Sequence, residues 1–541
     1  MKDVSSRNDV VNATLHDLYG KLVEDFRYVA QAKHWIHWNN RYWENGDQLF
    51  AEVFDKAIED HSINYDVDKS SIRRSLKEKL KIYKTNINSD FLIVTPTGTI
   101  DIILFKVSSR FKQDYSNQRP LWLKPSIEYK DRYITMCTKA SYKWQNKKDP
   151  TEYKKILLEN LSQDNELFDF HNTIDASILL GGLYHEYFYI YWGPGRNGKT
   201  LLLDIKRELL GSYSSTLSPY FFKTKTNDIN EDLYSRKEKR LVVVDEINRT
   251  MKYDTSLIKR ITGKNHFESV VDNDVENDFY VKFKCFFDTN HLPTIGIDES
   301  LGFWERVIIF PFRDVLPPSK RVNNLLERII NKELDDIFTF IVDDYLPKYL
   351  ACVQLPVEET QKATRVIENK SETNTKVYCI KDLKMPQKIS KAIEFYKFFV
   401  DPYSAFISNV CIKIEPDAIR SMKLRRYGMR ESFSIFAEFA REQLHSYMEH
   451  FGWTENTEAF YFADMHLSER LLFQILTSNG YYSSILNGTN TWTNLYIRQT
   501  YFYPGIDSTR KFDDHVVLFS NFIKDKKKTT FSSLMSHSTD D

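Results

Sequence analysis

The chain has no excess charge and no long apolar run. Lysine and arginine total 75 and aspartate and glutamate total 75 over 541 residues, so no bulk basic field attracts a nucleic acid. Any such binding therefore needs a local cluster of cations. The apolar runs are far shorter than a membrane span, and the N-terminal segment lacks the apolar region of a signal peptide. We expect no membrane partner and an intracellular, cytoplasmic location.

Cysteine is scarce as well. The chain has five, an odd number, and they are widely scattered. This distribution argues against a disulfide framework and against a zinc module, and it favours ordinary core or surface thiols. These residues are Cys137, Cys285, Cys352, Cys379 and Cys411. The length predicts two to four domains, and no internal repeat is present.

A glycine-rich loop stands between a predicted strand and a predicted helix. Residues 187–192 have the aromatic and β-branched composition of a buried strand, and apolar residues recur at helical spacing from Leu201 to Leu210. Between them, GPGRNGKT matches G-x-x-x-x-G-K-[ST], whose backbone N–H groups converge on phosphate oxygens. These flanks disfavour an accidental match. The predicted ATP-binding residues are Gly193, Pro194, Gly195, Arg196, Asn197, Gly198, Lys199 and Thr200, with the Thr200 hydroxyl as a magnesium ligand.

Two acids follow a second apolar strand. The segment RLVVVDEIN places Asp245 and Glu246 at its carboxyl end, 46 residues after Lys199. Parallel α/β sheets bind ligands at that edge. We expect Asp245 to hold Mg²⁺ and Glu246 to polarise the attacking water. The alternative is an ordinary strand end capped by acids.

Two further residues follow or precede strands in positions that suit nucleotide chemistry. Asn290 ends the strand VKFKCFFDTN, where its amide can orient water or sense the γ-phosphate, although asparagine is also a common turn residue. Arg306 lies 16 residues later, just before VIIFPF. It is either a finger acting on the nucleotide of a neighbouring subunit or a structural ion-pair residue.

Taken together, GPGRNGKT, VVVDE, FFDTNHLP and FWERVIIFPF resemble the superfamily 3 helicases, and most closely the poxvirus, phage and plasmid primase-helicase group. The resemblance covers roughly residues 30 to 500 and is specific only in the core. It implies AAA+ ATPase domains in a homo-hexameric ring that pulls single-stranded DNA through its channel, with ATP and Mg²⁺ as cofactors. It also implies forked DNA as substrate, a bacterial or viral replication site, and a replicative polymerase or primase as a further partner.

The chain departs from this group at two places. Where the group often has two adjacent arginines, Glu305 precedes Arg306. The segment HFESVVDNDVENDFYVKFK is expected to form the hairpin that grips DNA, yet its middle is acidic, through Asp272, Asp274, Glu276 and Asp278. An acidic tip repels phosphate, so the predicted DNA contacts are Lys264, Lys282 and Lys284.

The flanking regions carry weaker signals. Residues 14–31 predict a helix, residues 34–50 predict short strands with a turn at Asn45-Gly46, and residues 91–105 predict two strands around a glycine-containing turn. Closely spaced tryptophans at 35, 38 and 43 suggest either base stacking or, more often, a local core. Asp66 and Asp68 form a D-x-D pair without a rigid element, which argues against primase chemistry.

Towards the end, two helices and a strand pair about Asn487-Gly488 predict a winged helix; the alternatives are a structural cap or a protein-interaction module. A run of basic residues precedes these helices, and it is either a solvated face or a patch that contacts phosphate. Its members are Lys413, Arg420, Lys423, Arg425, Arg426 and Arg430.

The predicted fold is an α/β AAA+ P-loop core, a parallel sheet flanked by helices, with an N-terminal α+β region and a C-terminal winged-helix-like domain. The predicted parts are an N-terminal helicase-associated region (1–150), a helical collar with the ATPase core (151–352), a helix and linker (353–390), a winged-helix-like domain (391–510) and a disordered tail (511–541). The leading functional hypothesis is an ATP-dependent DNA helicase for replication of a virus, plasmid or mobile element. The alternatives are an ATP-regulated initiator that binds duplex DNA without translocation, and a protein-remodelling ATPase.

Overall fold

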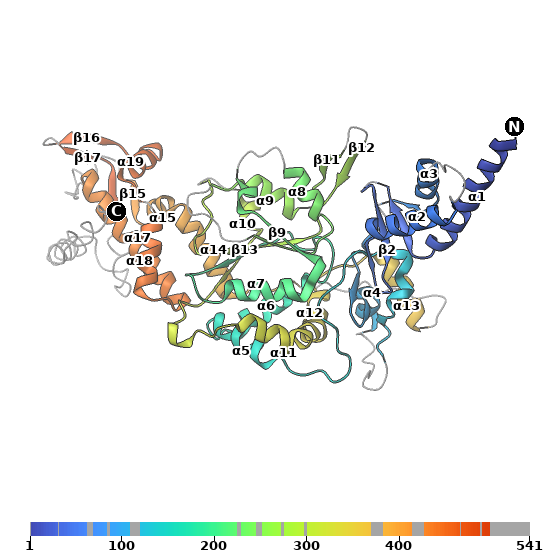
Figure 1. The fold of residues 1–541 in the computed structure, drawn as a ribbon. Coiled ribbons are helices and arrows are strands. Elements are labelled where there is room, and N and C mark those ends of the chain that lie inside the picture. Colours follow the sequence, from blue (N-terminus) through green and yellow to red (C-terminus); the bar gives the residue numbers. More distant parts are fainter. Residues whose placement is uncertain are drawn as a thin grey trace. The chain divides into compact units, whose positions relative to one another are not determined.

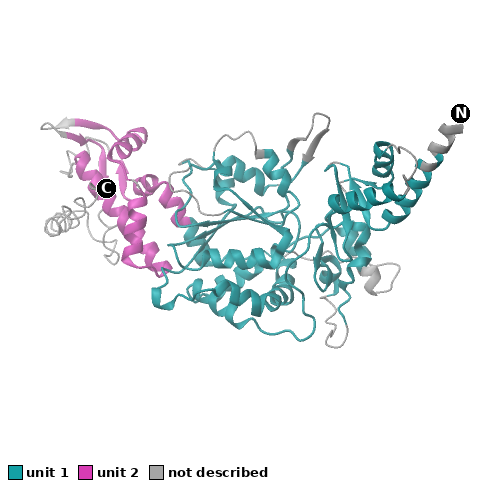
Figure 2. Cartoon of the chain, viewed as in Figure 1, with its two compact units in different colours: residues 1–393 teal, residues 394–541 magenta. Residues whose placement is uncertain are grey.

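The structure is a computed structural model of the chain. It describes residues 2–30, 32–61, 69–83, 87–108, 119–223, 229–244, 252–263, 265–271, 275–296, 300–368, 382–413, 427–465, 467–486 and 489–497. The chain divides into two compact units, residues 1–393 and 394–541 (Figure 2). The division falls within helix α14 (Gln387–Val400), and the sequence placed a domain boundary at 390/391.

The centre of the first unit is a five-stranded sheet. Its order is β14-β8-β13-β10-β9, and every neighbouring pair is parallel. The strands are β8 (Phe188–Trp192), β9 (Ser214–Leu217), β10 (Leu241–Val244), β13 (Lys284–Thr289) and β14 (Val307–Pro311). Because all strands run the same way, their carboxyl ends meet at one edge of the sheet, where the loop of residues 193–198 begins.

Helices cover both faces of this sheet, which is why strands β8, β10 and β14 are fully buried and carry no charged residue. Helices α6 and α7 lie along one face, and α8 and α9 along the other (Figure 1). The fold of this unit is therefore α/β, as predicted. The helices described between residues 151 and 350 are α5 (Thr151–Asn160), α6 (Asn165–Ser177), α7 (Lys199–Leu210), α8 (Ile229–Arg236), α9 (Thr255–Thr262), α10 (Leu301–Trp304), α11 (Leu325–Phe340) and α12 (Leu346–Leu350).

The described residues between 2 and 82 form a small α+β layer. It contains α1 (Lys2–Leu22), β1 (Phe26–Val29), β2 (His34–Trp38), β3 (Trp43–Asn45), α2 (Asp47–His61), α3 (Lys69–Lys79) and β4 (Lys81–Ile82), with sheet order β3-β2-β1-β4. Two sequence predictions were wrong here. The helix predicted over residues 14–31 ends at Leu22, and strand β1 follows it. The turn predicted at Asn45-Gly46 lies instead at residues 39–42, between β2 and β3, where Asn40 has a φ of 69°.

The tryptophans of this layer pack inside it. Trp35, Trp38 and Trp43 are each at most 4% exposed, and Trp35 stacks on Phe50 with ring centroids 3.9 Å apart. Their faces are used by the local core, so the base-stacking hypothesis was wrong and the core alternative is confirmed.

A second small sheet has the order β5-β6-β7. Strands β5 (Leu92–Thr95) and β6 (Gly98–Asp101) form the predicted antiparallel pair, and β7 (Leu123–Lys124) completes the sheet. Helix α4 (Ile102–Ser108) follows β6 and packs against α13 (Val357–Glu368). Strands β11 (Phe267–Val271) and β12 (Val275–Phe279) form the predicted hairpin, and Asp272 and Asp274 lie outside the described residues.

The second unit is mostly helical. It contains α15 (Pro402–Asn409), β15 (Cys411–Lys413), α17 (Met429–Phe451), α18 (Glu455–Asp464), α19 (Glu469–Ser478), β16 (Ser483–Leu486), β17 (Thr489–Trp492) and β18 (Leu495–Ile497). Strands β16 and β17 pair antiparallel after α19, while Asn487, Gly488 and the tail beyond 497 lie outside the described residues. Helices followed by a hairpin match the predicted element order, and the winged helix stays a prediction.

Most of the predicted basic run lies outside the described residues: Arg420, Lys423, Arg425 and Arg426. The same holds for Asp66, Asp68 and Cys379. The other four cysteines are free thiols, and three of them are buried. Across the described ranges, no helix is both long and apolar enough to cross a membrane.

Candidate nucleotide-binding site

The loop after β8 has backbone conformations that require glycine. Gly193 has a φ of 153° and Gly198 a φ of 89°. A Cβ on Gly193 would lie 2.7 Å from Nδ2 of Asn197, and a Cβ on Gly198 would collide with the side chain of Asn160. Glycine is therefore needed at both positions for backbone freedom and for space. The loop delivers the chain directly into the N-terminus of α7, which favours a bound anion.

Lys199 opens α7 and points back into the loop. Its side chain is 3% exposed. Nζ donates to the carbonyl of Gly193 at 2.9 Å, to Oδ1 of Asn197 at 3.0 Å and to Oδ1 of Asn290 at 3.0 Å. The ammonium is thus positioned by the loop's own backbone and by a side chain from the next strand. The structure brings together Lys199 and Asn290, two residues that the sequence assigned to one site.

Asp288 is a functional candidate that the sequence analysis missed. The Thr200 hydroxyl donates to its Oδ2, so a carboxylate and a hydroxyl meet at the N-terminus of α7. The position of Asp288 follows from strand register, because Asp288 of β13 pairs with Tyr191, the penultimate residue of β8. The signal was present in the motif FFDTN, where an acid stands two residues before Asn290.

The two predicted acids follow β10, on the other side of β13. Val244, the last residue of β10, pairs with Phe287, one residue before Asp288. Asp245 and Glu246 come next in the chain and lie outside the described residues. The sheet order therefore inserts β13, with Asp288 and Asn290 at its end, between the strand of the glycine-rich loop and the strand that leads to these acids.

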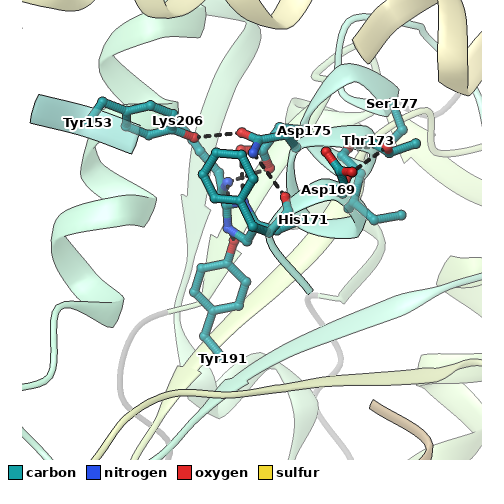
Figure 3. Close-up of polar contacts among 11 residues, drawn as sticks. Tyr153, Asp169, His171, Thr173, Asp175, Ser177, Tyr191 and Lys206 are labelled. Atoms are coloured by element: carbon teal, nitrogen blue, oxygen red, sulfur yellow. Dashed lines mark hydrogen bonds and ion pairs between the residues drawn. The ribbon is translucent and has the colours of Figure 1, made fainter. Parts of the chain in front are cut away.

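A buried polar cluster joins the elements on either side of the loop, and Figure 3 shows its side chains. Lys206 of α7 forms an ion pair with Asp175 of α6, and its Nζ lies 3.3 Å from Nε2 of His171. The hydroxyl of Tyr191, on β8, contacts the same Nε2. None of these side chains is more than 2% exposed. The cluster ties the strand before the loop and the helix after it to one supporting helix.

Electrostatics define the charge state of this cluster. Burial lowers the pKa of His171, and the charge of Lys206 lowers it further, so the imidazole is neutral. Because an ammonium only donates, Nε2 is the acceptor and Nδ1 carries the proton, 3.5 Å from Asp175. Burial raises the pKa of Asp175 and lowers the pKa of Lys206, while their mutual attraction opposes both shifts.

Arg306 lies at the opposite edge of the sheet from the loop. It directly precedes β14, and its carbonyl accepts from the amide of Phe188 at the start of β8. The length of a five-residue strand, about 16 Å, separates the two edges. Its guanidinium forms an ion pair with Glu186 and donates to the carbonyl of Gly302 at 2.5 Å. The structure therefore does not bring Arg306 to the loop of its own chain.

Two of the three predicted DNA contacts face inward. Lys284 is 3% exposed and donates to the carbonyl of Leu180 at 2.6 Å, and burial lowers its pKa to about 7. Lys282 is held between Asp90 and Glu238, each at 2.9 Å; burial opposes its charge, but the two acids raise its pKa. Both ammonium groups are committed to internal partners, which corrects their assignment as DNA contacts. Lys264 lies outside the described residues.

Two curated relatives resemble the chain at low identity. It is 27% identical over 187 residues to "Putative helicase L207/L206" of Acanthamoeba polyphaga mimivirus, covering 34% of this chain and 19% of the relative. It is 25% identical over 335 residues to "Putative helicase 184R" of Invertebrate iridescent virus 6, covering 57% of this chain and 30% of the relative. The chain thus spans less than a third of each relative, and both relatives are named as putative helicases.

No family model matches the chain. Among solved structures, the apo NrS-1 C-terminal region is similar with a TM-score of 0.39 and 12% identity, covering 87% of this chain and 95% of that one. A second apo form of the same region has the same TM-score and identity. These scores are too low to assign the fold, which is described above from the chain's own strands.

Proposed function

We propose that the chain is an ATP- and Mg²⁺-dependent DNA helicase of the superfamily 3, AAA+ type, acting in replication of a virus, plasmid or mobile element. The observation that carries this proposal is the contact between Lys199 and Asn290 at the carboxyl edge of the sheet. That contact unites the glycine-rich loop with a polar residue of the neighbouring strand. The distant viral relatives named as helicases support the choice of activity.

The residues present suit a triphosphate and a hard cation. Two glycines in the loop let its backbone approach a phosphate closely. Asn160, 1% exposed, lies against Gly198, and both polar atoms of its amide lack a hydrogen-bond partner among the described residues, so a polar group faces the loop. Hydroxyl and carboxylate oxygens, as on Thr200 and Asp288, are the ligands that Mg²⁺ prefers.

Each residue then has a role in phosphoryl transfer. When ATP and Mg²⁺ are bound, Lys199 would neutralise the β- and γ-phosphates, and Thr200 and Asp245 would hold the magnesium ion, with Asp288 orienting the Thr200 hydroxyl. Glu246 polarises the attacking water. The bound metal supplies charge neutralisation for the leaving phosphates. Asn290, which already contacts the ammonium of Lys199, positions that cation and senses the γ-phosphate.

Arg306 enters the mechanism only through a neighbouring copy. Its place at the far edge of the sheet fits the proposal of a homo-hexameric ring in which it reaches the nucleotide of the next subunit. The structural alternative, the ion pair with Glu186, is present within one chain. We propose single-stranded and forked DNA as substrate, with a replicative polymerase or primase as a further partner.

The proposal is tested by unwinding of a forked DNA duplex with ATP and Mg²⁺. We compare the native chain with Lys199→Ala and Glu246→Gln, and use Lys320→Ala, an exposed lysine, as the matched control. The expected result is strand separation by the native chain and by the control alone. ATP hydrolysis without unwinding would move the assignment to an initiator or a remodelling ATPase, and unimpaired unwinding by Lys199→Ala would refute the site.

A further inference from the structure

Helix α3 is strongly basic in a chain that is neutral overall. Its sequence KSSIRRSLKEK holds five lysines and arginines against one glutamate, a net charge of +4, while the whole chain sums to zero. The apolar side of the helix is fixed in the N-terminal layer through the buried residues Ile72 and Leu76. The cations are therefore presented by a helix that is anchored.

Four of these cations share one side of the helix. Lys69, Arg73 and Lys77 follow one another at intervals of four residues, which places them in a row along a helix surface, and Arg74 lies beside that row. Lys69, Arg73 and Arg74 are exposed and Lys77 is half-buried. Together with Ser70 they line a hollow of about 440 Å³.

These four cations are not neutralised within the described part of the chain. None of them forms an ion pair there, whereas the neighbouring Lys81 pairs with Glu78. Two of them instead lie over aromatic rings: Arg73 is 4.7 Å from the ring of Phe54, and Lys77 is 4.7 Å from the ring of Tyr28. Aromatic faces hold a cationic side chain in place and leave its charge intact.

This arrangement is unlike that of the lysines at the amino edge of the sheet. Lys282 has two carboxylate partners and Lys284 is buried, so neither offers a charge to a ligand. On α3, like charges at four-residue spacing repel one another. A row from residue 69 to residue 77 is about 12 Å long at 1.5 Å per residue, so one phosphate group cannot neutralise it. Several phosphates in succession along a nucleic-acid backbone can neutralise such a row.

We propose that the basic side of α3, formed by Lys69, Arg73, Arg74 and Lys77, binds the phosphodiester backbone of DNA. The inference rests on the proposed helicase function and adds a contact surface outside the ATPase core. The contacts are to phosphates, so they position the nucleic acid and do not select its sequence.

The test measures binding of the full chain to labelled single-stranded and duplex DNA of equal length by fluorescence anisotropy across a salt series. The variant is Arg73→Gln/Arg74→Gln/Lys77→Gln. The matched control is Lys155→Gln/Lys320→Gln/Lys332→Gln, which removes the same charge from three exposed lysines that form no ion pair in the described ranges. Circular dichroism and DNA-free ATP hydrolysis verify that both variants are folded.

The expected result is at least about a tenfold loss of affinity at low salt for the α3 variant alone. Its slope of log affinity against log salt falls by about 2, since each single-strand phosphate contact contributes about 0.7. Comparing the affinities for single-stranded and duplex DNA shows which of the two the α3 surface binds. Native affinity and slope in the α3 variant, with unwinding intact, would overturn this inference and leave the helicase proposal standing. Absence of DNA binding by the native chain would overturn both.

Discussion

The two edges of the central sheet each hold a buried lysine. Lys199 and Lys284 are both 3% exposed, and both donate to backbone carbonyl oxygens. Lys199, however, lies in a glycine-rich loop beside Asn290, at the edge where parallel strands end. Lys284 lies at the start of β13, where burial lowers its pKa to about 7. Burial of a lysine therefore does not by itself indicate a nucleotide-binding site. The edge of the sheet at which the lysine lies, and the residues beside it, distinguish the two cases.

The largest effect is expected from exchanging each lysine for methionine. If the proposed function holds, Lys199→Met removes the cation that neutralises the transferring phosphate, and we expect ATP turnover to fall by at least about 10³-fold, roughly 4 kcal/mol of transition-state stabilisation. Lys284→Met makes the same substitution at a lysine that is equally buried, and we expect its ATP turnover to stay within about threefold of the native value. Steady-state phosphate release measures both. An equal loss of ATP turnover in the two variants would contradict the proposed difference between the two edges of the sheet.

The second effect concerns the ion pair behind the loop. Lys206→Met leaves Asp175 buried without a counter-charge, and this lowers the free energy of unfolding by about 3 kcal/mol. The double variant Lys206→Met/Asp175→Leu regains most of that loss, because no buried charge is left. Chemical denaturation followed by circular dichroism measures the three proteins. A double variant as unstable as the single one would show that the pair is not a coupled unit.

The third effect is a pH dependence that belongs to Lys284. Its pKa is about 7 in the folded state, against 10.5 for an ordinary lysine. Between these values the unfolded chain binds the extra proton, so stability rises with pH. Relative to Lys284→Met, the native chain gains about 2 kcal/mol from pH 7 to pH 9, and below pH 7 the difference is flat. A difference that stays constant up to pH 9 would place Lys284 in solvent.

The smallest effect is expected at the Arg306–Glu186 pair, where Glu186 is 47% exposed. Glu186→Gln changes stability by less than about 1 kcal/mol because solvent screens the pair, and it leaves DNA-stimulated ATP turnover unchanged. Arg306→Ala lowers that turnover if the arginine serves a neighbouring subunit. Thermal unfolding and turnover assays measure both variants. Loss of turnover in Glu186→Gln would make this pair part of the site itself.

Local patterns were predictable from the sequence, and long-range pairing was not. The strand, loop and helix around Lys199 follow from apolar spacing and glycine positions within about 25 residues. The β5–β6 hairpin was equally local. Lys282 looked like a surface cation because Asp90, its partner, is far away in the chain. The motif FFDTN contains Asp288, but its contact with Thr200 depends on the register of β13 against β8, which the sequence does not show.

The turn near residue 40 shows a different limit. Asn45-Gly46 is a strong turn signal, but Asn40 adopts the left-handed conformation instead, and Gly46 lies against the backbone of Ile36 and His37, where a Cβ would not fit. The glycine serves close packing and not the turn. A dipeptide alone does not distinguish the two uses.

Hydrogen exchange with and without a non-hydrolysable ATP analogue and Mg²⁺ compares the two ends of β8 in one experiment and shows which of them holds the nucleotide. We expect the amides of Gly193 and of residues 195–198 to exchange more slowly with the nucleotide, while those of residues 184–187, before the strand, keep their rate. Protection confined to residues 184–187, or none at either end, would contradict a nucleotide site at the carboxyl edge.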